Sequence, residues 1–142
     1  MNPDTATATR TALDLTPLRD ALAGAAFGPG DPEWDVARSA WNLAVDQHPA
    51  AVALPESAED VVAAVRFARE AGLRVAVQGT GHNAAAYGDL GDSLLIKTER
   101  MRSVEVDPAD RTARVGAGVT WGEVVGPAAE HGLAALAGSS ND

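Results

Sequence analysis

Cysteine is absent from the 142-residue chain, which excludes disulfides, thiolate metal sites and cysteine nucleophiles. Basic residues are few: eleven Lys and Arg stand against twenty Asp and Glu, for a formal net charge of -9. Because the eleven are scattered, the sequence predicts neither a nucleic-acid groove nor a site for an anionic membrane surface. An anionic ligand would therefore have to be held mainly by backbone N–H groups.

Long apolar runs are also missing, and none approaches the roughly 18 residues that span a bilayer. Residues 1–8 have no basic start, no apolar core and no twin-Arg pair, so no secretory signal is predicted and we expect a cytoplasmic protein. What the chain does have is 46% hydrophobic residues within the length of one domain, enough to bury a core.

Residues 1–47 are expected to form an N-terminal tail and a helical arm. A mobile tail to about residue 15 is followed by a short helix that starts at Thr16-Pro17-Leu18 and ends near Gly24. Residues 27–32 are rich in Gly and Pro and predict a loop. A spacing of three and four residues, typical of a helix, then separates Trp34, Ala37, Trp41 and Val45. We interpret the two tryptophans on this stripe as packing residues.

Residues 48–99 predict a βαβ unit with parallel strands. An apolar strand over 51–54 stops at Pro55, and a capping box from Ser57 to Asp60 starts a helix that ends at Gly72. A second strand covers 74–77, and a third covers 93–98. The apolar face expected for the helix consists of Ala58, Val61, Val62, Val65 and Ala68.

From about residue 100 the predicted strand pairing changes from parallel to antiparallel. Alternating residues over 104–106 and 112–115 predict a hairpin, and Thr120 and Glu123 can cap a helix that runs to about His131. Pro127 is expected to kink or interrupt that helix. The fold class is therefore α+β, with a parallel first subdomain over 48–99 and the beginning of an incomplete second subdomain over 100–142.

A glycine-flanked turn, Gly79-Thr80-Gly81, follows the second strand of the βαβ unit. Ligands of open α/β sheets bind beyond the carboxyl ends of the strands, and glycines there allow successive N–H groups to gather around a phosphate. The spacing matches neither the Rossmann nor the Walker pattern, because position 84 is Ala and no G-K-[ST] follows.

His82 comes directly after this turn. From the local pattern alone, a histidine here could simply hydrogen-bond a neighbouring carbonyl. No metal site is predicted, since His48 and His131 belong to other elements and no H-x-x-x-H spacing exists. The G-x-S-x-G elbow of serine hydrolases is missing too.

About a hundred residues, from Trp41 to Ser140, resemble the start of a known cofactor domain. The matching pieces, in order, are Trp41-Asn42, Pro49, Ser57-Ala58-Glu59-Asp60-Val61, Ala68-Arg69-Glu70-Ala71-Gly72, Gly79-Thr80-Gly81-His82, Leu94-Leu95-Ile96 with Met101, Val115-Gly116-Ala117-Gly118-Val119-Thr120-Trp121, and His131-Gly132-Leu133 leading into Gly138-Ser139-Ser140. Together they are similar to the PCMH-type FAD-binding domain of berberine-bridge-enzyme-like oxidases, in the vanillyl-alcohol-oxidase and p-cresol-methylhydroxylase superfamily.

The resemblance implies an FAD-dependent oxidase in which residues 78–83 wrap the FAD pyrophosphate and His82 bonds covalently to the 8α-methyl carbon of the flavin. A neutral imidazole on an exposed loop is a competent nucleophile for that bond. The implied cofactor-binding residues are Gln78, Gly79, Thr80, Gly81, His82, Asn83, Gly138, Ser139 and Ser140.

The chain also departs from the family pattern, which often has Arg, Ser and Gly where this chain has Gln78, Gly79 and Thr80, and Ser in place of Asn83. Thr80 must keep an ordinary φ. Many members add a second flavin bond through a cysteine, so at most one bond is expected here.

By the same resemblance the chain is an N-terminal fragment. The catalytic base and the residues that select a small-molecule substrate are expected beyond residue 142, and dioxygen is the expected oxidant. Two alternatives remain: a truncated product that binds no flavin, and a non-covalent FAD reductase akin to the cell-wall UDP-sugar reductases, against which His82 argues. The oligomeric state is undetermined.

Overall fold

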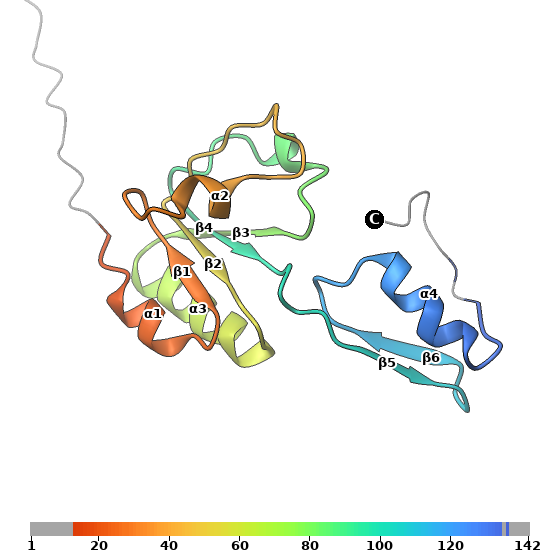
Figure 1. Cartoon of the computed structure of the whole chain (residues 1–142). Coiled ribbons are helices and arrows are strands. Elements are labelled where there is room, and N and C mark those ends of the chain that lie inside the picture. Colours follow the sequence, from red (N-terminus) through yellow and green to blue (C-terminus); the bar gives the residue numbers. More distant parts are fainter. Residues whose placement is uncertain (1–12, 135, 137–142) are drawn as a thin grey trace, which may run out of the picture.

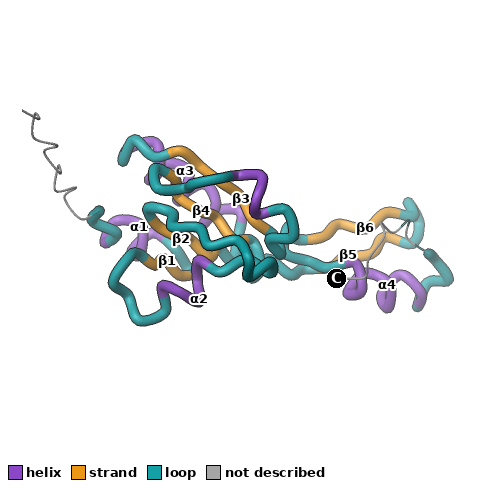
Figure 2. Tube along the Cα trace, turned by 90° about the horizontal axis from the view of Figure 1, so that it is seen from above, coloured by secondary structure: helices purple, strands orange, loops and turns teal. Residues whose placement is uncertain are grey.

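A computed structural model describes residues 13–134 and residue 136. Figure 1 shows two parts, a four-stranded sheet with its helices and, after about residue 100, a hairpin carrying one helix. From above, in Figure 2, the two parts follow one another along the length of the molecule. Within the described residues, no helix combines the length and apolar character needed to cross a membrane.

The first sheet is mixed. Its strands lie in the order β1 (Ala25–Phe27), β2 (Ala51–Leu54), β4 (Ser93–Lys97) and β3 (Arg74–Gln78). β4 is parallel to both β2 and β3, which confirms the predicted parallel unit, while β1 runs antiparallel to β2. The assignment of Phe27 to a loop was wrong, because three residues are too few to show a pattern before they pair with β2.

The central helix α3 (Ala58–Glu70) has the predicted caps. The Ser57 hydroxyl accepts a hydrogen bond from the Asp60 N–H at 3.1 Å, and Gly72 has a φ of 68°. Its predicted apolar face was only partly right: Ala68 is buried and Val61 half-buried, but Ala58, Val62 and Val65 are exposed. The other buried positions are Asp60 and Ala64. Asp60 accounts for this rotation, because its carboxylate accepts hydrogen bonds from the preceding loop and turns that face inward.

Helices cover both faces of the first sheet. α1 (Thr16–Ala21) and α3 pack on one face, where Leu15 and Leu18 join the core with Leu94 and Ile96. The predicted tail therefore ends before the buried Leu15. The N-cap of α1 is Leu15, and the Asp14 side chain accepts a hydrogen bond from the Thr16 N–H at 2.9 Å.

On the other face, α2 (Trp34–Arg38) covers Val52 and Leu95. The helix predicted to continue to Val45 ends at Arg38 instead, and Trp41 is exposed. Helical spacing was misleading here because only Trp34 and Ala37 face the core, while Ser39 is already extended.

The second part confirms the predicted hairpin. β5 (Val104–Asp107) pairs antiparallel with β6 (Thr112–Val115) and packs against α4 (Trp121–Ala129), which starts with a Thr120–Glu123 capping box. The expected interruption at Pro127 was wrong, because Pro127 lies inside a helix that continues to Ala129.

Candidate cofactor site

The six loop residues of the predicted site lie together at the carboxyl ends of the parallel strands. Gln78, the last residue of β3, is in register with Lys97, the last residue of β4. The Gln78 carbonyl accepts a hydrogen bond from the Thr98 N–H at 3.0 Å. Residues 79–83 continue directly from this paired end, on the edge of the sheet where open α/β folds bind ligands.

The loop presents a row of free donors. Within the part of the chain that the structure describes, none of the backbone N–H groups of residues 79–83 donates a hydrogen bond. Gly81 has a φ of 92°, and its carbonyl accepts from the Ala84 N–H at 3.1 Å, which closes the turn. Consecutive N–H groups around a positive-φ glycine form a concave site suited to an anion.

Gln78 lies directly beneath this turn. The residue is only 5% exposed, and its Nε2 is buried without a hydrogen-bond partner among the described residues. A Cβ atom at Gly81 would stand 2.9 Å from that Nε2 and 2.8 Å from the Cβ of Ala40, so no side chain fits there. A buried donor left unpaired costs about 1–3 kcal/mol, which favours a ligand with acceptor oxygens at this loop.

Lys97 is a buried charged residue near the loop that was not predicted from the sequence. Its side chain is 6% exposed, and its Nζ donates to the Ser39 carbonyl at 2.9 Å and lies 3.4 Å from a Glu99 carboxylate oxygen. Residues in register on parallel strands project to the same face, so Lys97 accompanies Gln78 behind the loop. A lysine at the end of the apolar run Leu94-Leu95-Ile96 was the available signal.

His82 is exposed and contacts two side chains. Its ring meets Trp41 edge-on, with centroids 4.3 Å apart and planes at 79°, and its Nδ1 lies 3.3 Å from the Thr80 hydroxyl. The simpler interpretation, a histidine bonded to a neighbouring carbonyl, was wrong for the described residues. The contact of Trp41 with His82 was not predicted, because spacing along the chain does not relate residues about forty positions apart.

The remaining predicted residues divide into two groups. Thr80 keeps an ordinary φ, as expected, since Arg111 is the non-glycine residue with positive φ in the described ranges. Asn83 is exposed and precedes the short 3₁₀ helix η1 (Ala84–Tyr87). Residues 138–140, Gly138, Ser139 and Ser140, lie outside the described residues. Across residues 13–134 and 136, no group of three or more His, Cys, Asp or Glu could hold a metal ion.

The loop is an open surface and not a closed cavity. A pocket of about 640 Å³ lies elsewhere, at the amino ends of the parallel strands beside Ala50 and Gly91, with Arg19 and His48 in its wall. A ligand held by residues 79–83 would therefore be covered on one side by this loop only.

Comparison with known proteins identifies related chains. The family described as "FAD binding domain" matches residues 49–141. The sequence is 35% identical over 123 residues to (R)-6-hydroxynicotine oxidase of Paenarthrobacter nicotinovorans, covering 87% of this chain and 26% of that protein.

Two solved structures share the fold. The crystal structure of 6-hydroxy-D-nicotine oxidase from Arthrobacter nicotinovorans aligns with a TM-score of 0.78 and 34% identity, over 89% of this chain and 27% of the other. The BBE-like 1 protein of Physcomitrella patens aligns with a TM-score of 0.68 and 29% identity, over 80% and 25%. The chain spans about a quarter of the length of these relatives.

Proposed function

The chain belongs to the family of FAD-binding domains, and we propose that it forms part of the cofactor domain of an FAD-dependent oxidoreductase. The observation that carries the proposal is the loop of residues 79–83, which follows a parallel strand within the matched range. Among the residues that the structure describes, its five backbone N–H groups have no acceptor. The residues present fit FAD, because the loop offers donors for a diphosphate and the unpaired Gln78 Nε2 lies beneath it.

The anionic end of FAD would be held mainly by the backbone. A chain with a net charge of -9 repels a diphosphate at long range, and Lys97 behind the loop is already paired with the Glu99 carboxylate. The attraction therefore has to come from the backbone N–H groups. Gly81 allows the close approach, since no Cβ could be accommodated between the turn and the Gln78 amide.

We further propose that His82 binds the flavin covalently through its 8α-methyl group. Forming this bond breaks one methyl C–H bond and the imidazole N–H bond and creates one N–C bond. Dioxygen accepts the two electrons and two protons and leaves as hydrogen peroxide. The exposure of His82 at the end of the loop leaves its ring accessible to such a partner.

The reaction of the whole protein would be oxidation of a small-molecule alcohol, C–H or C–N centre. When bound, FAD supplies the hydride acceptor and passes the electrons to dioxygen. This chain contributes the cofactor loop, and the residues that select the substrate and remove its proton are expected elsewhere. Small substrate and dioxygen are thus the proposed partners, in the cytoplasm.

The test uses the protein expressed from this sequence together with any coding sequence that continues it in frame. We expect a yellow protein that keeps its colour in the pellet after acid precipitation, because a covalent bond survives unfolding. His82→Ala should release all flavin into the supernatant. His131→Ala is the matched control, since that exposed histidine lies in the turn after α4 and should leave the colour in the pellet.

Two outcomes would overturn parts of the proposal. A wild-type protein that takes up no FAD on reconstitution contradicts the FAD function and favours the truncated, flavin-free alternative. A yellow protein whose flavin is washed out completely by acid contradicts the covalent bond and favours a non-covalent reductase.

A further inference from the structure

The segment of residues 39–47, between α2 and β2, lies against the cofactor loop of residues 79–83. It precedes residue 49, where the match to the FAD-binding domain family begins, so that match does not assign it to the cofactor site. Figure 1 shows the segment beside the chain that follows β3. Its first residue is held to the end of β4, because the Lys97 Nζ donates to the Ser39 carbonyl at 2.9 Å.

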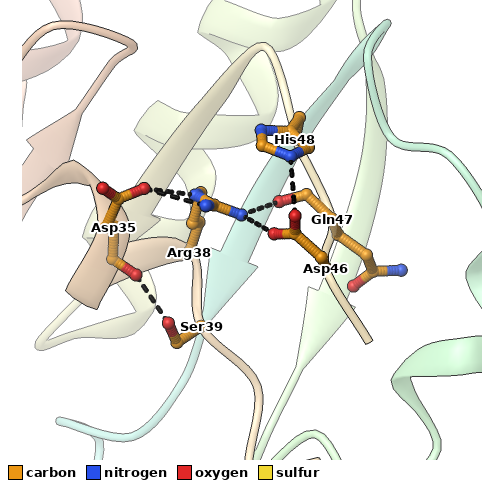
Figure 3. A network of polar contacts seen from close by, with 6 residues as sticks. All are labelled: Asp35, Arg38, Ser39, Asp46, Gln47 and His48. Atoms are coloured by element: carbon orange, nitrogen blue, oxygen red, sulfur yellow. Dashed lines mark hydrogen bonds and ion pairs between the residues drawn. The ribbon is translucent and has the colours of Figure 1, made fainter. Parts of the chain in front are cut away.

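The two ends of the segment are joined by Arg38 (Figure 3). The guanidinium binds the Asp35 carboxylate at 2.8 Å, the carboxylate of Asp46, and the carbonyl of Gln47 at 2.9 Å. A planar guanidinium has five N–H donors in a fixed fork and can serve several acceptors at once. The hydrogen bond from Arg38, and after it that from His48, holds the pKa of Asp46 below its usual range. Arg38 therefore closes the segment into a defined loop.

Gln47 fastens this closed segment to η1. The residue is buried, and its Nε2 donates to the carbonyls of Ala84 and Gly88, at 2.9 and 3.0 Å. A side-chain amide has two N–H donors, and both are used here. Ala84 also donates its own N–H to the Gly81 carbonyl at 3.1 Å. Gln47 thus holds the residue that closes the glycine turn.

Two further contacts lie at the turn itself. The Trp41 N–H donates to the Thr80 carbonyl at 3.0 Å. Ala40 is buried beneath Gly81, where its Cβ would stand 2.8 Å from a Cβ added to the glycine. The segment therefore supports the cofactor loop from behind through both a hydrogen bond and close packing.

This support sets the direction of the loop's N–H groups. Three carbonyls accept backbone hydrogen bonds: Gln78 from Thr98, Thr80 from Trp41, and Gly81 from Ala84. In a trans peptide unit the C=O of one residue and the N–H of the next point in opposite directions, and the peptide units of the loop are trans. The N–H groups of Gly79, Gly81 and His82 therefore point away from those donors.

We infer that residues 38–47 are a positioning element of the cofactor loop, in which Arg38 and Gln47 are the anchoring residues and the Trp41 N–H turns the Gly81 N–H outward before an anion binds. Donors that are ordered in advance lose less entropy when the ligand arrives. That the anion is the diphosphate of FAD rests on the proposed function above. The order of the loop does not, and it can be measured on the flavin-free chain.

The first test is amide hydrogen exchange of the 142-residue chain, followed by NMR. In the wild type we expect the Trp41 and Ala84 amides to be protected, although the Trp41 residue is 65% exposed. Amides at these two positions that exchange as fast as those of an unstructured chain would overturn the inference without the need for a variant.

Two variants release the anchors one at a time. Gln47→Leu keeps an apolar side chain of similar size but removes both donors, and Arg38→Gln removes the fork. We expect either change to speed exchange at Trp41 and Ala84 by at least about tenfold, because local opening becomes easier. Rates at both positions equal to those of the wild type in both variants would overturn the anchoring roles.

Two controls separate local release from a general loss of structure. Arg66→Gln is the matched substitution, since Arg66 is exposed on α3, and it should leave both amides as protected as in the wild type. The Leu95 amide, in the buried strand β4 between β2 and β3, should keep its rate in every variant. Where Leu95 also exchanges faster, the whole fold has been lost, and the protection measured in the wild type decides.

The second test measures FAD binding by the longer in-frame protein, with His82→Ala in every sample so that binding stays reversible. We expect Kd to rise about tenfold on adding Gln47→Leu or Arg38→Gln, and to stay the same on adding Arg66→Gln. Equal Kd values in all samples would overturn the inference. A protein with His82 intact that takes up no FAD instead contradicts the proposed function, and the exchange rates then still decide whether the segment orders the loop.

Discussion

Asp60, in the first turn of α3, shows how one charged residue organises its surroundings. It is 3% exposed, and its carboxylate accepts hydrogen bonds from the N–H groups of Ala23, Gly24 and Glu56 at 2.9–3.0 Å. Burial by itself would raise the pKa of Asp60, but these three donors, with the Ser57 side chain, bring it below its ordinary value. The ionised carboxylate therefore ties the loop before β1 to the start of α3.

We predict that Asp60→Asn destabilises the chain by about 2–3 kcal/mol, because its amide NH₂ faces donors that a carboxylate oxygen satisfied. Urea unfolding at neutral pH measures this. Glu59→Gln is the matched control, since Glu59 is exposed in the same helical turn and its loss should cost only a few tenths of a kcal/mol. Equal unfolding midpoints for the two variants would contradict the role given to Asp60.

The same carboxylate predicts a pH dependence. Because its pKa is lowered on folding, the stability it contributes is present above the unfolded pKa, about 3.9, and is lost as the pH falls through the folded value. The difference in stability between wild type and Asp60→Asn should therefore be greatest near pH 7 and shrink below pH 4. A difference that grows on acidification would contradict the assignment.

At the scale of elements, the segment before α4 docks closely on the backbone of residues 98–101, which follow β4. The Gly118 N–H donates to the Met101 carbonyl at 3.0 Å, and the Thr98 hydroxyl donates to the Ala117 carbonyl at 2.9 Å. A Cβ at Gly118 would lie 1.9 Å from the Thr98 carbonyl oxygen, and one at Gly116 would lie 2.2 Å from that of Met101. This junction joins the two parts and requires glycine.

We predict that Gly118→Ala and Gly126→Ala change stability in opposite directions. The first forces two backbones apart and should cost about 1–3 kcal/mol. The second lies within α4 with nothing within 4 Å of its added Cβ, and should stabilise by up to about 1 kcal/mol through helix propensity. Thermal unfolding of both variants checks this, and a Gly118→Ala protein as stable as wild type would show that the junction yields easily.

At the scale of the whole molecule, much of the second part is uncovered. All four residues of β6 are exposed, and within residues 13–134 and 136 β6 pairs on one side only, with β5. The cofactor loop is likewise open: residues 79, 80, 82 and 83 are exposed, so the loop would contact a ligand from one side. A bound molecule would find few of the contacts that offset the entropy lost on binding.

We therefore predict that the 142-residue chain alone binds FAD weakly or not at all. Titration of the chain with FAD, followed by flavin fluorescence, measures this binding. Gly81→Val is the control, because a side chain there meets Gln78 and Ala40 and removes any signal that depends on the loop. A stoichiometric micromolar complex of the wild-type chain, absent in Gly81→Val, would show that the loop and its neighbours form a sufficient site.

Much was determined by the sequence itself, because the relevant signals are local. The start of α3 is marked by Ser57 and Asp60, and its end by Gly72. Pro55 ends β2, and the turn around Pro108 produces the β5–β6 hairpin. The glycine turn before His82 could be placed at a strand end for the same reason. The resemblance to FAD-binding oxidases, which rests on ordered short motifs, is confirmed, whereas covalent attachment at His82 stays a prediction.

Only the tertiary structure determined which distant residues meet. β1 exists because three residues pair with β2, and α2 ends early because Arg38 turns the chain back toward Asp46. Trp41 reaches His82, and Lys97 reaches Ser39, through contacts between segments about forty to sixty residues apart. Spacing along the chain carries no information about such pairs, since they depend on the order β1-β2-β4-β3 and on how each loop folds back across it.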